Sequence, residues 1–169
     1  VVIDRAIEIG HIFQLGRKYA QALDLTVLDQ NGKSQVVTMG SYGIGVSRAV
    51  AAIAEQTHDE IGLNWPREIA PADIHIVATG KEAEVFKAAL TLAEDLEEKG
   101  LRVMFDDRPD ASAGVKFKDA ELIGIPFIVI VGKALSEGKV EFRVRRTGEK
   151  TEIELLKAVT EITSRVLNS

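Results

Sequence analysis

The stretch Ala120-Glu-Leu-Ile-Gly-Ile-Pro-Phe-Ile-Val-Ile-Val131 decides the fold class of this chain. Residues 115–123 predict a short helix, and Gly124 supplies the residue that commonly closes one. The run Pro126–Val131 is almost wholly apolar, which is typical of a strand buried on both faces. A helix followed at once by such a strand predicts an α/β sheet.

The same alternation of strands and helices extends to both sides of this stretch. Short apolar runs rich in β-branched residues predict strands, and apolar residues at i, i+3 and i+4 predict helices. Gly100 is expected to end the first of these helices. The strands are expected at 74–78, 101–105 and 140–144, and the helices at 86–96 and 155–166. The pattern predicts a mixed, mainly parallel α/β domain over residues 74–169.

Toward the N-terminus the pattern changes to antiparallel sheet followed by a helix. Residues 7–15 alternate as in a strand. Asn31-Gly32 stands between apolar runs at 25–28 and 36–39, and such a dipeptide is a strong β-hairpin signal. Residues 46–54 then carry apolar side chains at helical spacing, so a helix is expected to follow the sheet.

Residues 62–73 are predicted to be a linker between these two parts. They hold two of the four prolines and show no clear periodicity. The predicted domains are therefore 1–61 and 74–169. The first is near the lower size limit for an independent core, whereas the second is close to the common domain size.

Composition excludes several classes of protein. The 169 residues include 21 Lys and Arg against 26 Asp and Glu, a net charge of −5, which argues against coating nucleic acid or membranes through bulk positive charge. A local basic patch stays possible. The absence of cysteine excludes disulfides, thiol nucleophiles and Cys-based zinc sites. His11, His58 and His75 show no ligand spacing, so no bound metal is predicted. No apolar run reaches the roughly 20 residues of a membrane helix.

The sharpest local motif is Met39-Gly-Ser-Tyr-Gly-Ile-Gly-Val-Ser-Arg48. Its glycines match neither the dinucleotide fingerprint nor the phosphate loop. They do permit a ligand to approach the backbone next to a helix N-terminus, which favours anions. Arg48 lies in the first helical turn, where the helix dipole disfavours a cation, so it is expected to serve a ligand. A tight turn with a solvated arginine is the alternative.

His11 is open to two interpretations. Strict alternation puts it on the same face as Ile9 and Phe13, which predicts a core histidine. A bulge at Gly10 would instead move it to the face of Glu8 and Gln14.

A basic strip, defined as residues 139–150, carries five Lys and Arg against two Glu. Arg143 and Arg145 are expected to share one strand face, and Lys116 and Phe117 are expected at a loop-to-helix junction. Cations beside an aromatic ring are typical of single-stranded RNA recognition. A solvated strand edge protected by charge is the alternative.

Several of these stretches, in this order, resemble the C-terminal portion of the bacterial-type prolyl-tRNA synthetase family. Residues 39–48 resemble motif 3 of class II synthetases. The other matching stretches are 7–16, 64–71, 106–108, 114–117 and 121–126. Together they cover nearly the whole chain, and the run Gly-His-Ile-Phe-Gln-Leu-Gly (residues 10–16) favours proline over threonyl or glycyl relatives.

The resemblance implies a two-step reaction in which proline and ATP form prolyl-adenylate and the prolyl group passes to tRNA(Pro). By matching position, Arg48 would lie along the adenine and reach the γ-phosphate. His11 would line the proline pocket, which replaces the core interpretation, and Glu8 would lie on the ATP side. The residues expected to bind ATP or proline are Gly40, Ser41, Gly43, Gly45 and Arg48. Position 41 is Ser, where many relatives have Cys.

The resemblance also implies an anticodon site in the second part. Phe117 would stack on a base next to the anticodon, and Glu121 would accept hydrogen bonds from a guanine edge. Position 128 is Ile, where some relatives carry an Arg that contacts the anticodon. The candidate anticodon residues are Lys116, Phe117, Glu121, Arg143 and Arg145.

The family further implies ATP with Mg²⁺, a cytoplasmic homodimer as the parent enzyme, and no membrane partner. The chain begins without Met, and motifs 1 and 2 of the family are not found in it. We therefore expect a piece of the enzyme that does not activate proline alone. The alternative is a non-catalytic RNA-binding accessory protein that reuses the anticodon-binding domain.

Overall fold

The computed structural model describes residues 2–168 and divides into two compact units, Val1–Ala52 and Ile53–Ser169. Each unit is described by itself. The division falls inside helix α2 (Val46–Thr57).

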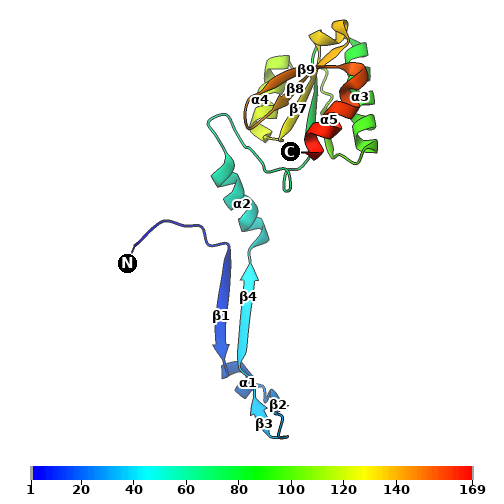
Figure 1. The fold of residues 1–169 in the computed structure, drawn as a ribbon. Helices are drawn as coiled ribbons and strands as arrows, with labels where there is room; N and C mark the ends of the chain where they lie inside the picture. Colours follow the sequence, from blue (N-terminus) through cyan, green and yellow to red (C-terminus); the bar gives the residue numbers. More distant parts are fainter. Residues whose placement is uncertain (1, 169) are drawn as a thin grey trace. The chain divides into compact units, whose positions relative to one another are not determined.

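The first unit is built from antiparallel strand pairs (Figure 1). Strand β1 (Gly10–Gly16) pairs with β4 (Met39–Ile44), and β2 (Thr26–Leu28) pairs with β3 (Ser34–Val36). The carboxylate of Asp29 accepts hydrogen bonds from the main-chain N–H groups of Asn31 and Lys33, which holds the turn of the second pair. The hairpin predicted around Asn31-Gly32 is confirmed. A short helix, α1 (Lys18–Ala22), was not predicted.

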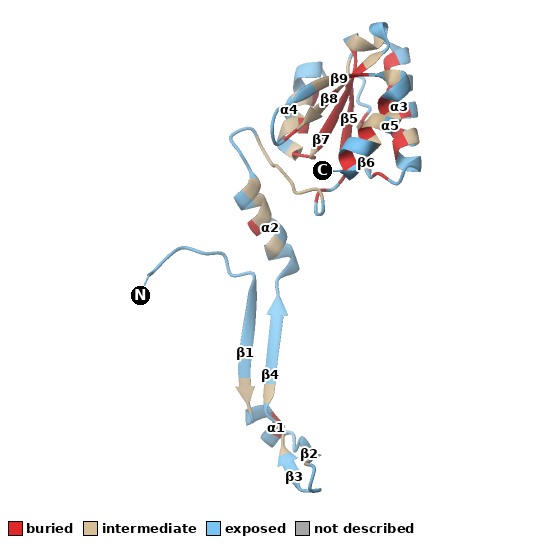
Figure 2. Ribbon diagram, in the orientation of Figure 1, coloured by how far each residue is buried: buried red, intermediate tan, exposed pale blue. Residues whose placement is uncertain are grey.

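The first unit has almost no interior of its own. Among its described residues only Ala20 and Ala52 are buried, and Figure 2 shows β1 and β4 as mostly exposed. Burial of apolar surface is the main stabilising term in folding, so this unit alone has little to stabilise it.

The second unit is a five-stranded mixed sheet in the order β6-β5-β7-β8-β9. The three strands β6, β5 and β7 are parallel, and β8 and β9 continue the sheet antiparallel. The strands are β5 (Ile74–Ala78), β6 (Val103–Asp106), β7 (Phe127–Val131), β8 (Lys139–Val144) and β9 (Lys150–Glu154). The predicted mixed α/β fold is confirmed.

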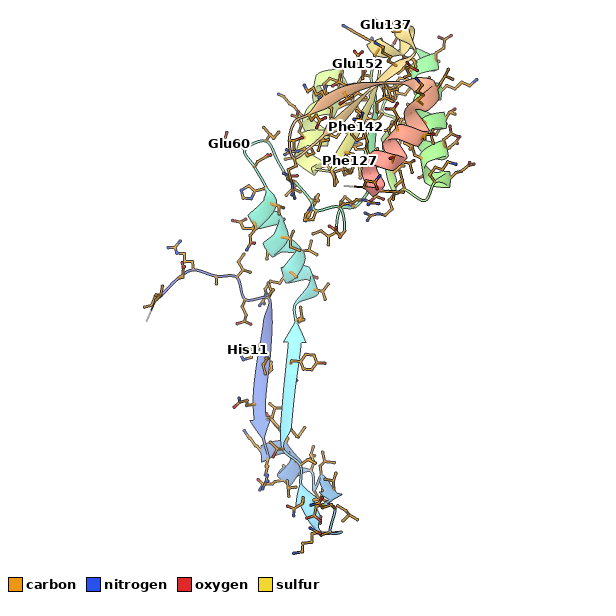
Figure 3. All side chains as sticks on the ribbon, in the orientation of Figure 1. His11, Glu60, Phe127, Glu137, Phe142 and Glu152 are labelled. Atoms are coloured by element: carbon orange, nitrogen blue, oxygen red, sulfur yellow. The ribbon has the colours of Figure 1, made fainter. Side chains whose placement is uncertain are left out.

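Helices cover both faces of this sheet. Helices α3 (Ala83–Glu98) and α5 (Leu155–Leu167) pack on one face, where they bury Ile74, Ile76 and Phe142. Helix α4 (Ala113–Ile123) packs on the other face against a smaller cluster around Val77 and Ile128. Phe127 and Phe142, labelled in Figure 3, are both buried, and their stacked rings have centroids 5.6 Å apart.

The stretch 120–131 folds as its sequence predicts. Ser112 caps α4 by accepting a hydrogen bond from the N–H of Val115, and Gly124 ends the helix with φ +74°. All five residues of β7 are buried. The helix and the buried strand predicted there are both confirmed.

Strand β9 and the 3₁₀ helix η1 (Lys133–Glu137) were not predicted. In β9 only Ile153 is buried, and most of its other side chains are charged. An edge strand of this kind lacks the apolar run on which strand prediction depends.

The predicted linker, residues 62–73, makes specific contacts within the second unit. The N–H groups of Leu63 and Trp65 donate to the carbonyls of Leu122 and Gly124, at 3.0 and 3.1 Å. A Cβ atom on Gly124 would lie 2.0 Å from the Leu63 carbonyl oxygen, so only glycine permits this approach. The segment is thereby held against the end of α4.

Candidate functional site

Three of the candidate catalytic residues lie close together in the first unit. Arg48, in the first turn of α2, donates from Nη1 to the main-chain oxygen of Glu8 at 3.0 Å and lies 3.7 Å from its Oε1. The same Oε1 is 3.9 Å from Nδ1 of His11. All three side chains are more than half exposed. The guanidinium is therefore oriented by Glu8 and still open to a ligand.

The strand register explains why small residues stand opposite His11. His11 is paired with Gly43, and Phe13 is paired with Ser41, so these four positions share one face of the β1–β4 pair. The rings of His11 and Phe13 stack at 4.2 Å. Because Gly43 has no side chain, the space beside the imidazole is left open.

The other glycines of the motif continue this pair into the helix. Gly40 is opposite Gln14 in the register, and the N–H of Gly45 donates to the Ile9 carbonyl at 2.8 Å. A Cβ atom on Gly45 would lie 3.2 Å from Cβ of Arg48. The small residue at 45 therefore gives room to the arginine.

His11 is not a core residue in this chain, because its side chain is 53% exposed; Figure 3 shows it on β1. The core position favoured by alternation is wrong here. The bulge at Gly10 is also wrong, since the register shift lies between Gln14 and Gly16. The placement of His11 in a proline pocket stays a prediction.

A second group of candidate residues surrounds a small hollow in the second unit, which we call the Phe117 hollow. Its volume is about 70 Å³. The Arg143 guanidinium carbon lies 5.0 Å from the centre of the Phe117 ring, a cation–π arrangement, and Arg143 also bonds Glu141. The Glu121 side chain forms no hydrogen bond or ion pair with another described residue. The hollow is lined by Ile61, Phe117, Ala120, Glu121, Ile128, Arg143, Val144, Arg145, Gly148 and Lys150.

Three residues that line this hollow lie side by side on neighbouring strands of the sheet. Arg143 is paired with Ile128 on β7 and with Lys150 on β9, so the three share the face that α4 covers. Lys150 belongs to the basic strip but was not singled out. Its position across from Arg143 depends on β9, and the sequence signal for that strand is weak.

Lys116 lies in the interior, which corrects the surface position expected for it at a loop-to-helix junction. Its side chain is 1% exposed. The ammonium donates to the carbonyls of Ala78 and Asp106 at 2.7 and 3.2 Å, and it lies 5.1 Å from the centre of the Phe86 ring. A direct contact of Lys116 with RNA stays a prediction, and it would require the ammonium to leave both carbonyls.

Arg145 is also buried, although Arg143 and Arg145 both line the Phe117 hollow. Its guanidinium donates to both carboxylate oxygens of Asp59 and to the Glu121 carbonyl. These hydrogen bonds hold the pKa of Asp59 well below its usual range. The expectation that Arg143 and Arg145 share one strand face is therefore corrected, because Arg145 lies beyond the end of β8 (Lys139–Val144) and joins the Asp59 turn to α4.

Neighbouring carboxylates reduce the positive charge of the basic strip. Lys139 bonds Glu152 at 2.8 Å, and the pKa of Lys139 is raised mainly by that contact. Arg143 and Arg145 are paired with Glu141 and Asp59, as described above. Lys150 and Arg146 form no ion pair with another described residue. These two cations are the part of the strip most available to a polyanion.

A further cavity of about 330 Å³ lies on the α4 side of β5 and β6. The His75 imidazole in its wall is buried, and burial lowers its pKa. At the rim, Arg108 bonds Asp106 and Asp119, both at 2.7 Å. Hydrogen bonds from Arg108 lower the pKa of Asp106 to about 2.

Two family models match the chain. The model described as "Anticodon binding domain" matches residues 73–165, and the one described as "tRNA synthetase class II core domain (G, H, P, S and T)" matches residues 1–57. The resemblance of residues 7–16, 39–48 and 64–126 to a class II synthetase is thereby supported in both parts of the chain.

Sequences similar to this chain include proline–tRNA ligases. The chain is 66% identical over 149 residues to the proline–tRNA ligase of Nocardioides sp. strain JS614, covering 88% of this chain and 25% of that protein. It is 60% identical over 162 residues to the enzyme of Kineococcus radiotolerans, covering 96% of this chain and 28% of that protein. The chain thus spans about a quarter of the length of these relatives.

A solved structure shares the fold. The prolyl-tRNA synthetase of Cryptosporidium parvum, crystallised with L-proline and AMP, superposes with a TM-score of 0.80 at 23% identity. It covers 95% of this chain, and the chain covers 34% of it. Among residues 2–168, no helix is long and apolar enough to cross a membrane, and no cluster of three or more metal-ligating side chains is found.

Proposed function

We propose, since this chain belongs to the prolyl-tRNA synthetase family, that it supplies motif 3 of the proline-activating site together with the surface that reads the proline anticodon. The proposed domains are 1–61 for the first role and 74–169 for the second, joined by 62–73. The parent enzyme is proposed to act as a cytoplasmic homodimer.

In the proposed reaction, a carboxylate oxygen of proline attacks the α-phosphorus of ATP and pyrophosphate leaves. The 3′-terminal ribose hydroxyl of tRNA(Pro) then attacks the prolyl carbonyl and AMP leaves. Neither step needs a protein nucleophile, so positioning and charge stabilisation carry the catalysis. Mg²⁺ is proposed to enter with the ATP phosphates and to neutralise their charge.

The first unit supports this role through the Arg48–Glu8–His11 group. The Arg48 guanidinium is held at Glu8 and is more than half exposed, so it can lie along an adenine and pair with a phosphate. The proline ring and its ammonium are proposed to lie beside His11, opposite Gly43 and next to Ser41. Gly40 and Gly45 are proposed to let the nucleotide approach the backbone.

The observation that carries the RNA-reading half is the Phe117 hollow. Phe117 and Arg143 offer a π-face and a cation for a base, and the Glu121 carboxylate is not engaged by another described side chain. A guanine edge presents N1–H and N2–H₂ donors, which a carboxylate accepts. Lys116 and Arg145 are proposed to position the walls of the hollow, since both side chains are buried and held by hydrogen bonds.

The test compares the affinity of the chain for a proline-anticodon stem-loop with its affinity for the same loop carrying replaced guanines, at fixed salt. We expect weaker binding to the replaced loop. Glu121→Gln should reduce this preference more than it reduces total binding, whereas Glu98→Gln, an exposed change on α3, should change neither. Equal affinities for both loops would contradict the proposal.

The catalytic half has its own test. Proline-dependent ATP–pyrophosphate exchange is expected to stay at background with this chain alone, because the chain spans about a quarter of the relatives. In a full-length relative, replacing the arginine aligned with Arg48 by Lys should abolish most of the exchange, because a planar guanidinium serves both stacking and charge pairing. Exchange by the chain alone would overturn this expectation.

A further inference from the structure

A recess distinct from the Phe117 hollow is formed by the 64–68 segment and the adjoining ends of β7 and β8. Its volume is about 380 Å³, large enough for a nucleobase with its ribose. Trp65, Asn64 and Arg146 are among the residues that line it. Val144 lines both this recess and the Phe117 hollow, so the two meet at the end of β8.

Three polar side chains of this recess are not engaged elsewhere in the described part of the chain. The Trp65 indole N–H, the Asn64 amide and the Arg146 guanidinium form no hydrogen bond with another described residue. A half-buried tryptophan usually finds a partner for its N–H. Here an aromatic face, an amide and a cation converge on one opening, which is the combination that binds an unpaired nucleotide.

The backbone that carries Trp65 is fixed before any ligand arrives. Its N–H donates to the Gly124 carbonyl at 3.1 Å. Arg102 donates to the carbonyls of Ala70 and Arg67 at 2.7 and 2.8 Å, and it shares the Asp73 carboxylate with the Arg67 side chain. A surface that is already ordered loses less entropy on binding.

The charge around the recess also favours RNA, although the chain as a whole is acidic. The charged groups in and around the recess include three guanidinium groups and two carboxylates. The cations are Arg67, Arg102 and Arg146, and the anions are Asp73 and Glu68. Only Arg146 among the three arginines is without an ion pair to another described residue. It is the cation that a phosphate would meet.

We propose that the Trp65–Arg146 recess binds one unpaired nucleotide that flanks the anticodon of the same RNA, with the base on the indole and the phosphate at Arg146. This inference rests on the proposed function, in which residues of the Phe117 hollow contact the anticodon. The recess extends the RNA-binding surface around the end of β8. It assigns a ligand to the predicted 62–73 linker and to Arg146 of the basic strip.

The single tryptophan of the chain makes the proposal directly measurable. A fluorescein-labelled proline-anticodon stem-loop is titrated with the full chain, while anisotropy reports binding and tryptophan emission reports the recess. We expect emission from Trp65 to be quenched with the same midpoint as the anisotropy change. Phe117→Leu should move both midpoints together. Binding that leaves the emission unchanged would overturn the recess and keep the proposed function, whereas absence of any binding would overturn both.

Variants separate stacking from general attraction. Trp65→Leu should weaken binding about tenfold, and Trp65→Phe, which keeps an aromatic face, should recover most of that loss. An abasic site at the flanking nucleotide that contacts Trp65 should weaken RNA binding by the unaltered chain about tenfold. The same abasic RNA should cause little further loss of affinity in the Trp65→Leu variant. If every abasic position has the same effect in both proteins, the proposal fails. If Trp65→Leu does not fold, the emission and anisotropy titration of the unaltered chain still tests whether Trp65 contacts the RNA.

Arg146→Gln tests the phosphate contact. It should lower the slope of log affinity against log salt by about 0.7, the value for one phosphate of a single strand. Lys99→Gln removes an equal charge at the end of α3 and should leave the slope unchanged. Equal slopes for Arg146→Gln and the unaltered chain would contradict the contact.

Discussion

Asp59 and Arg145, 86 residues apart in sequence, are joined by two hydrogen bonds of 2.7 and 2.8 Å. The guanidinium is buried, and it also donates to the carbonyl of Glu121 in α4. The pair therefore holds together the turn before residue 62, the end of β8 and the helix that carries Glu121. Arg145 thereby fixes the frame of the Phe117 hollow, which it also lines, and its role in anticodon binding stays a prediction.

Asp59→Asn should destabilise the second unit, because it leaves the buried Arg145 guanidinium without its carboxylate. We expect the Tm to fall by about 5 °C in thermal unfolding followed by circular dichroism. Asp110→Asn, a change at an exposed aspartate, should leave the Tm within about 1 °C of the unaltered value. Equal shifts in the two variants would show that the pair contributes nothing specific.

Asp106, which is bonded to Arg108, should make the free energy of unfolding depend on pH in the acid range. The pKa of Asp106 is lowered from 3.8 to about 2 in the folded chain, so its ionised form stabilises the fold above pH 3.8. That contribution is lost as the pH falls from about 4 through 2. Urea unfolding at a series of pH values should show Asp106→Asn and the unaltered chain converging in this range. Parallel curves, as expected for Asp110→Asn, would contradict the assignment.

Gly124→Ala and Gly138→Ala form a matched pair. Both glycines follow a helix with φ near +70°, so both changes incur backbone strain of about 1–2 kcal/mol. A Cβ atom at 124 would also lie 2.0 Å from the Leu63 carbonyl, whereas nothing lies within 4 Å at 138. We expect Gly124→Ala to lower the free energy of unfolding clearly more than Gly138→Ala in urea titrations. A similar loss in both would mean that the 62–73 segment does not depend on this contact.

Phe117→Leu and Lys150→Gln should weaken RNA binding in different ways. Phe117→Leu removes the π-face beside Arg143 and should reduce affinity about tenfold at every salt concentration. Lys150→Gln removes a cation that has no ion pair with another described residue, so it should lower the salt slope by about 0.7. Anisotropy titrations at several salt concentrations measure both effects. A lowered salt slope for Phe117→Leu would contradict the stacking contact of Phe117, and an unchanged salt slope for Lys150→Gln would contradict the phosphate contact of Lys150.

Short-range features of the chain were enough to predict most of its elements. The apolar run of β7, the glycine that ends α4 and the Asn31-Gly32 hairpin all depend on neighbours within a few residues. Such features are governed by steric preferences and periodic burial, which the linear order of residues expresses directly. The motif around Arg48 was recognisable for the same reason, since its glycines and its arginine lie within ten positions.

The roles of the charged side chains, by contrast, depended on contacts between distant segments. The buried Lys116 ammonium donates hydrogen bonds to carbonyl oxygens of β5 and β6, one of them 38 residues away, and nothing in its local sequence signals this. Lys150 faces Arg143 only because β9 pairs with β8. Trp65 lines a recess only because Gly124 admits the 62–73 segment against α4. The sequence alone therefore located most of the strands and helices and the motif around Arg48, and the packing of remote segments determined which charged side chains are exposed to solvent.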